Sequence, residues 1–126
     1  MTDFTMNKDA DGVATITWDV AGKTMNVMSL DGAQQLSDHI DDALADDAVN
    51  GIVITSGKET FAGGMDLNLL AKMNADAADD PAKGLFEGTM RMHGLLRKIE
   101  RAGMDKKTNK GGKPIASALP GTAAGI

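Results

Sequence analysis

Two glycine-containing turns are the parts of this 126-residue sequence whose residue types point to chemistry. The first lies in "TFAGGMDLNLL", residues 60–70, and the second in "ALPGTAAGI", residues 118–126. Glycines at the end of a strand allow backbone N–H groups to face a bound oxygen at the entrance to a helix. Two such turns, at the ends of two strands of one parallel sheet, would direct two N–H groups at a single point.

A pair of N–H donors of this kind is an oxyanion hole. It stabilises the negative charge that develops on the oxygen of a thioester or another acyl group, and one donor contributes about 3 kcal/mol. A purely local interpretation stays open, because a Gly-Gly turn followed by an aspartate that caps a helix needs no ligand. An oxyanion hole requires no particular side chain, so composition does not decide between the two.

The titratable residues suggest few other chemistries. The sequence has no cysteine and two histidines, His39 and His93, which excludes disulfides and thiol nucleophiles and disfavours a zinc site. His93 falls on the apolar side of a predicted helix, where we expect a core or interface histidine rather than a base. Glu59, Glu87 and Glu100 are predicted to be surface charges.

The net charge of −5 excludes some classes of partner. Acidic runs such as "DDALADD" would repel nucleic acid and anionic membranes. Residues 104–113, "MDKKTNKGGK", are predicted to form a solvated loop, with contact to a phosphorylated ligand as the alternative. The polar first residues do not resemble a targeting peptide, and no apolar run approaches the ~18 residues that span a bilayer. We therefore expect a soluble, cytoplasmic protein without membrane insertion.

The first half of the chain predicts a hairpin, a helix and a strand. "DFTMNK" and "VATITWDV" flank the turn signal "DADG", and the alternation of Ala14, Ile16 and Trp18 with threonines predicts one buried face. Ser29 is placed to cap a helix. Its apolar residues recur at helical spacing: Leu30, Ala33, Leu36, Ile40, Ala43 and Leu44. The run "GIVITS" then predicts a central strand covered on both faces.

The second half predicts two helices and a strand. Asp66 is expected to cap a short helix, "LNLLAKM", and "NADAADDPAKG" to form a mobile acidic loop. A long helix is predicted over about residues 85–102. Its apolar side carries Phe86, Met90, His93, Leu96 and Ile99. "PIASAL" then predicts a buried strand parallel to "GIVITS", joined by a right-handed crossover. Together these elements predict one α/β domain with a mainly parallel sheet.

Three ordered motifs resemble the crotonase (enoyl-CoA hydratase/isomerase) family. "TFAGGMDL" is similar to its pattern of phenylalanine, two small residues, glycine, any residue, aspartate and leucine or isoleucine. "KPIASALPGTAAG" resembles its Lys-Pro, strand, Asn-Gly and alanine-rich segment, and "GVATITWDVAGKTMNVMS" its apolar strand, loop and Asn-anchored turn. This resemblance implies a ClpP/crotonase fold with ββα units, of which residues 1–126 form the N-terminal part. "MNVMS" and the lysine loop most resemble the hydratase portion of bacterial fatty-acid β-oxidation complex α subunits.

The resemblance also implies the site residues. It assigns the oxyanion donors to the backbone N–H groups of Met65 and Ile126; isoleucine departs from the small residue that the family favours at the second position. A loop at Lys23 would lie over coenzyme A, although a solvated surface lysine is an equal alternative. The implied substrate-binding residues are Lys23, Thr24, Met25, Ala62, Gly63, Gly64, Asp66 and Leu67.

The implied activity is hydration of trans-2-enoyl-CoA through an enolate-like intermediate. Family hydratases use two glutamates around a water, and the position of one falls beyond Ile126, so the chain alone is expected to be inactive. An incomplete sheet would expose a face and an edge, so this chain by itself is also expected to be poorly soluble or to depend on partner chains. Hydration implies no metal and no cofactor beyond the coenzyme A of the acyl-CoA thioester, and NAD would serve a downstream dehydrogenase portion. A homotrimer or larger β-oxidation complex is implied.

Three alternatives stay open from the sequence. Isomerase, thioesterase, hydrolase and decarboxylase reactions use the same hole with other side chains. A non-catalytic CoA-binding or scaffold protein would bind the thioester without acid/base residues. A generic phosphate-binding α/β module would bind nucleotides without preference for coenzyme A.

Overall fold

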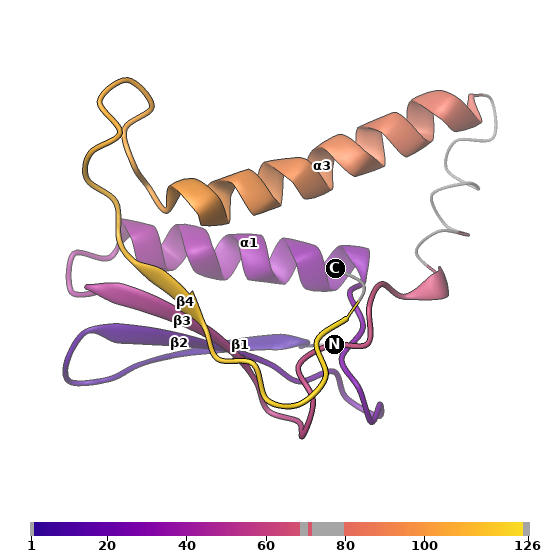
Figure 1. Cartoon of the computed structure of the whole chain (residues 1–126), viewed down its shortest axis with the longest axis horizontal. Helices are drawn as coiled ribbons and strands as arrows, with labels where there is room; N and C mark the ends of the chain where they lie inside the picture. The colour runs from indigo at the N-terminus through magenta and orange to yellow at the C-terminus, as the bar shows by residue number, and fades with distance from the viewer. Residues whose placement is uncertain (1, 69–70, 72–79, 125–126) are drawn as a thin grey trace.

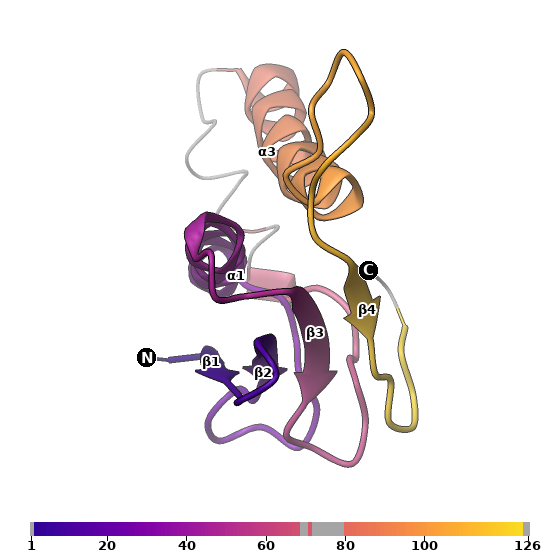
Figure 2. The same cartoon turned by 90° about the vertical axis from the view of Figure 1, so that its left-hand side faces the viewer.

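A computed structural model describes residues 2–68, 71 and 80–124. Four strands form one sheet in the order β1-β2-β3-β4. Helix α1 packs on one face of the sheet, and α3 lies on the outer side of α1 (Figure 1). Figure 2 shows the same layers end-on, with no described helix on the opposite face of the sheet.

Strands β1, Phe4–Lys8, and β2, Val13–Trp18, form the predicted antiparallel hairpin. The alternation in β2 buries Ala14, Ile16 and Trp18, which are at most 2% exposed. The rings of Phe4 and Trp18 stack with their centroids 5.3 Å apart, where the register pairs these two residues across the strands. Such aromatic cross-strand pairs contribute to the stability of a sheet. The predicted buried face of the hairpin is confirmed.

Strand β3, Gly51–Ser56, is central, since it pairs in parallel with both β2 and β4, Ile115–Ser117. The prediction that it is covered on both faces was wrong. Ile52 and Ile54 are buried under α1, whereas Val53 on the other face is only partly buried. That face carries threonines on β2 and β3, which tolerate water, and no described helix covers it.

Strand β4 is shorter and more exposed than predicted. Only Ile115 is partly buried, and Ala116 and Ser117 are exposed. The reason is its place at the edge of the described sheet, where three residues pair with β3 and nothing pairs on the other side. The prediction of a second fully buried strand was therefore wrong, although its parallel pairing is confirmed.

Helix α1, Leu30–Ala45, begins and ends as its sequence dictates. The Ser29 hydroxyl accepts a hydrogen bond from the Gly32 N–H at 3.0 Å, so the predicted cap is confirmed. At the other end, the Lys113 ammonium donates to the carbonyls of Ala43 and Asp46, at 2.9 and 2.5 Å. A cation at this end satisfies terminal carbonyls and complements the helix dipole.

Helix α3, Pro81–Arg101, begins four residues before the predicted start. Asp80 caps it, because its carboxylate accepts from the Lys83 N–H at 3.1 Å, and Pro81 occupies a first-turn position that suits proline. Residues 80–84 therefore belong to the helix and its cap, not to a loop. The rest of the predicted acidic loop, residues 74–79, lies outside the described residues.

The predicted buried side of α3 was also wrong. Leu95 is buried and Met92 and Ile99 pack against the core, whereas the predicted side is largely exposed. Its exposed members are Phe86, Met90, His93 and Leu96. Helix α3 therefore carries two apolar stripes, and the one with Met92, Leu95 and Ile99 faces inward. Lys98 lies beside this stripe, and its ammonium donates to Ser37 and Asp41 of α1 at 2.6 and 3.0 Å.

Adjacent leucines of α3 test this orientation. Leu95→Ala is expected to lower the free energy of unfolding by about 2–3 kcal/mol, because it empties a buried site. Leu96→Ala should change it by no more than about 0.5 kcal/mol, since Leu96 is 46% exposed. Both variants are the same substitution in the same helix, so urea unfolding compares them directly. Equal losses, or a larger loss for Leu96, would show that α3 buries the other stripe.

Candidate functional site

Three loops meet at the carboxyl ends of the parallel strands. They follow β2, β3 and β4 as residues 19–28, 57–66 and 118–124. Figure 1 shows them at one end of the sheet, with residues 104–113 at the other. Ligands of parallel α/β sheets bind at this edge, so the location suits a ligand site and separates the lysine loop from it.

The segment that carries Met65 leaves its backbone N–H without an acceptor in the described part of the chain. The N–H of Met28 donates to the carbonyl of Gly64 at 2.9 Å, and the N–H of Asp66 donates to the carbonyl of Met28 at 2.8 Å. Met28 and Met65 form a parallel bridge, in which Met28 bonds to the residues before and after Met65. The N–H and C=O of Met65 itself therefore point away from Met28. The N–H of Met65 has no acceptor among residues 2–68, 71 and 80–124.

The second glycine turn lies directly beside the first. Ala62 and Ala123 form a parallel bridge, in which the N–H groups of Phe61 and Ala62 both donate to the carbonyl of Thr122, at 2.9 and 3.1 Å. The N–H of Ala124 returns a bond to Ala62 at 3.2 Å. Main-chain bonds thus hold the two turns together. Ile126, the predicted second donor, lies outside the described residues.

Asn26 anchors these loops from the interior. Its side chain is fully buried. The carbonyl oxygen Oδ1 accepts from the Val20 N–H at 3.0 Å, and the amide Nδ2 lies 2.9 Å from the Trp18 carbonyl, 2.9 Å from Ser56 Oγ and 3.0 Å from the Phe61 carbonyl. One side chain therefore ties the loop after β2 to the loop after β3.

The predicted coenzyme A loop lies at the surface of this cluster. Lys23 and Thr24 are exposed, and Met25 is partly buried. A Cβ added at Gly63 would lie 3.4 Å from Met25 Cε and 3.5 Å from Met25 Cβ, so this loop contacts the glycine turn. The structure brings Met25 and Gly63 together, and it places Lys23 and Thr24 in solvent beside them.

The other predicted site residues differ in how far their side chains are exposed. Ala62 is 1% exposed, so its side chain packs in the core, whereas Met65 and Leu67 are 37% and 80% exposed. Asp66 accepts a hydrogen bond from the Asn68 N–H at 2.9 Å, which supports its predicted capping role. Helical structure is described at residues 67, 68 and 71, and residues 69–70 and 72–73 of the predicted helix lie outside the description.

Among the described residues, the carboxylates of the predicted surface glutamates and the lysine loop form no hydrogen bond or ion pair with this cluster, although the main chain of Glu59 belongs to the loop after β3. Glu59, Glu87 and Glu100 are exposed, as predicted. The lysine loop is a small hairpin in which the Thr108 and Lys107 N–H groups donate to the Asp105 carboxylate, and these bonds hold the pKa of Asp105 below its ordinary value.

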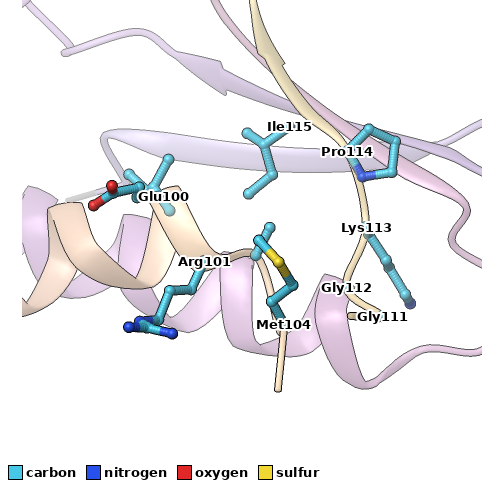
Figure 3. Close-up of a pocket in the computed structure, with 10 residues that line it drawn as sticks. Glu100, Arg101, Met104, Gly111, Gly112, Lys113, Pro114 and Ile115 are labelled. Carbon is cyan, nitrogen blue, oxygen red and sulfur yellow. The ribbon is translucent and has the colours of Figure 1, made fainter. Parts of the chain in front are cut away.

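The largest change to the lysine-loop prediction concerns Lys113. It caps α1 instead of facing solvent. A hollow of about 500 Å³ lies beside it, between the end of α3 and β4 (Figure 3). Met104 points toward Ile115 there, while Lys113 points away. The hollow lies at the other end of the sheet from the loops that follow β2, β3 and β4 (Figure 1), so it is not part of the candidate site.

Two further features, a cluster of metal ligands and a membrane-spanning helix, are absent from the described residues. Across the described ranges, no three His, Cys, Asp or Glu side chains are grouped so that they would hold a metal ion. In the same part of the chain, no helix has the length and apolar character needed to cross a membrane.

Comparison with solved structures defines the class of fold. The chain superimposes on an enoyl-CoA hydratase from Shewanella pealeana with a TM-score of 0.77 and 13% identity, over 95% of this chain and 40% of that one. An enoyl-CoA hydratase from Thermoplasma volcanium gives 0.70 and 21%, over 94% and 40%. The chain therefore has the α/β crotonase fold, and the predicted fold class is confirmed.

Comparison with curated sequences points to a particular group of relatives. The chain is 35% identical over 68 residues to the fatty acid oxidation complex subunit alpha of Shewanella halifaxensis. The match covers 53% of this chain and 10% of that protein. No family model matches the sequence. The chain thus resembles a short stretch of a much longer relative, in agreement with the resemblance inferred from the motifs.

Sequence reasoning missed two residues that shape this site, Ser56 and Lys58. Ser56 Oγ donates to the Thr60 carbonyl at 2.7 Å and accepts from the Lys58 N–H at 2.9 Å. Lys58 reaches back across the loop after β2. Only the "SGK" turn after a strand marks them in the sequence, and a turn signal does not reveal which distant carbonyls a side chain will meet.

Proposed function

We propose that this chain forms the thioester-binding part of an enoyl-CoA hydratase site, with the N–H of Met65 as one oxyanion donor. The observation that carries the proposal is the Met65 N–H, which has no acceptor among the described residues and lies beside the bridge of Ala62 and Ala123. Preorganised backbone donors of this kind stabilise negative charge at an acyl oxygen. The names of the fold neighbours and curated relatives support hydration within fatty-acid oxidation.

In this proposal the thioester carbonyl lies between Met65 and a second donor at Ile126. Addition of water to the enoyl group places negative charge on that carbonyl oxygen, which the hole stabilises. The reaction also needs a placed acid and base. Glu59, Glu87 and Glu100 are exposed and fill neither role, so those groups come from residues outside the described ranges.

The loop that carries Lys23, Thr24 and Met25 would receive the coenzyme A part of the ligand. Hydration itself uses no metal or further cofactor in this proposal, and NAD would serve a downstream dehydrogenase portion, as the family resemblance implies. Assembly into a homotrimer or larger complex, and a cytoplasmic location, are part of the same proposal. Isomerase or hydrolase chemistry would use the same donors with other acid/base residues.

Ligand binding tests the proposal without requiring turnover. Butyryl-CoA, a saturated thioester, is expected to bind the 126-residue chain with a dissociation constant in the micromolar to millimolar range by calorimetry. Excess ATP should not displace butyryl-CoA, because the proposed site contacts the thioester and the pantetheine as well as the phosphates. Absence of butyryl-CoA binding would contradict the proposal, and equal competition by ATP would support a general phosphate-binding module.

Catalysis provides the complementary measurement. The chain alone is expected not to reduce the absorbance of crotonyl-CoA, because the proposed reaction takes its acid and base from residues outside the described ranges. Sustained loss of that absorbance would show that a residue of this chain performs the acid/base step.

A further inference from the structure

Lys58 has an environment that is unusual for a lysine. Its side chain is 12% exposed, and its ammonium donates to the carbonyls of Val20 and Lys23 at 2.8 and 2.7 Å. It also forms an ion pair with Asp19 at 2.8 Å. An ammonium has three N–H donors, and here three acceptors surround it. Lys58 is therefore directed at its own chain and has no donor left for a ligand.

The acceptors of Lys58 lie on the loop that the proposed function assigns to coenzyme A. Apart from the turn at residues 21–22, no other hydrogen bond of the described residues involves residues 21–25. Gly22 has φ +74° and nothing within 4 Å of an added Cβ, so local packing does not fix the loop. Asn26 anchors its end. Among the described residues, Lys58 alone forms a hydrogen bond to its middle.

The turn that carries Lys58 also leads to the segment with Met65, the proposed oxyanion donor. Lys58 lies between β3 and Phe61, and its N–H donates to Ser56 Oγ, which in turn donates to the carbonyl of Thr60. Met25, two residues beyond the Lys58 acceptor at Lys23, packs against Gly63. One turn therefore sets the distance between the coenzyme A loop and the glycine turn that carries Met65.

We propose that Lys58 is a positioning residue for acyl-CoA binding, which holds residues 20–25 in the conformation that receives the coenzyme A part of the ligand. This inference rests on the proposed function. Without the ammonium, the carbonyls of Val20 and Lys23 would turn toward water, and the loop would sample other conformations. Binding would then have to order the loop again, which weakens affinity.

Lys58→Met tests the inference, with Lys113→Met as its matched control. Lys113 also donates to two main-chain carbonyls, but at the end of α1 remote from the site. Both variants should lose stability to a similar extent. Only Lys58→Met is expected to weaken butyryl-CoA binding tenfold or more. The backbone order parameters of residues 21–25, from ¹⁵N relaxation, should fall from about 0.85, the value of a rigid backbone, to below about 0.6 in Lys58→Met and stay unchanged in Lys113→Met.

A milder variant keeps the test informative if Lys58→Met does not fold. Asp19→Asn removes the charge of one of the three acceptors, and Asp19 is 56% exposed. We expect it to weaken butyryl-CoA binding two- to threefold while the chain stays folded. Unchanged affinity in this variant would contradict the inference.

The outcomes separate this inference from the proposed function. If the unaltered chain does not bind butyryl-CoA, the proposed function fails, and the inference fails with it. If the unaltered chain binds and Lys58→Met binds equally well, the inference alone is wrong. Unchanged order parameters of residues 21–25 in Lys58→Met would also overturn it, whatever the affinity. Equal weakening by Lys113→Met would indicate a general loss of stability instead of positioning.

Discussion

Asn26→Ala is expected to lower the free energy of unfolding by about 3–4 kcal/mol, the largest loss among the single substitutions considered. The substitution removes a fully buried amide and leaves the Val20 N–H and the Phe61 carbonyl without that partner. The Trp18 carbonyl also loses its bond to the amide but keeps the one from the Gly57 N–H. A net hydrogen bond contributes about 0.5–1.5 kcal/mol, and an unsatisfied buried group costs about 1–3 kcal/mol. Two such groups, together with the bond lost at the Trp18 carbonyl, account for the expected loss.

Asn50→Ala is the matched control for Asn26→Ala. Asn50 is exposed and its amide makes a single 3.1 Å bond to the carbonyl of Asp11. This variant should lose no more than about 1 kcal/mol. Urea unfolding, followed by circular dichroism, measures both. A loss for Asn26→Ala no larger than that of Asn50→Ala would show that water or loop movement satisfies the groups that Asn26 leaves.

Gly121→Ala is expected to separate the two glycine turns and to weaken butyryl-CoA binding at least tenfold. An added Cβ would lie 2.6 Å from the carbonyl oxygen of Glu59 and 3.3 Å from Thr60 Cα, and both are backbone atoms that cannot rotate away. The residue also has φ +56°, which costs a non-glycine residue roughly 1–2 kcal/mol. The segment must therefore shift, and the bonds to Thr122 would weaken.

Gly111→Ala separates backbone strain from the steric clash. Gly111 has φ +79°, but nothing lies within 4 Å of an added Cβ. We expect a stability loss of about 1 kcal/mol and unchanged butyryl-CoA affinity, because the residue lies in the loop remote from the site. Similar effects of both variants on calorimetric binding would contradict the role assigned to close packing at Gly121.

The sequence predicted the elements whose patterns are local. Alternation in "VATITW" and helical spacing after Ser29 correctly identified the hairpin, α1 and its cap. The side of α3 that packs inward was not predictable in the same way, because two apolar stripes follow the same period. Only the partner helix, with Asp41 placed to meet Lys98, selects between them.

The candidate site was predictable only in part, for a similar reason. Glycine turns have a sequence signature, and the structure places the two turns side by side. The roles of Asn26 and Lys58 depend on main-chain carbonyls that the fold brings from other loops. A carbonyl is present at every residue, so no residue pattern indicates which carbonyls a buried amide or ammonium will meet.

The most direct test of the central claim is the amide resonance of Met65 in a chain labelled with ¹⁵N-methionine. If the Met65 N–H donates to the thioester oxygen, saturating butyryl-CoA should shift its proton resonance downfield. The amide of Met6, in β1 away from the loops, should not move. A Met65 resonance that stays in place while calorimetry shows the ligand bound would contradict the account.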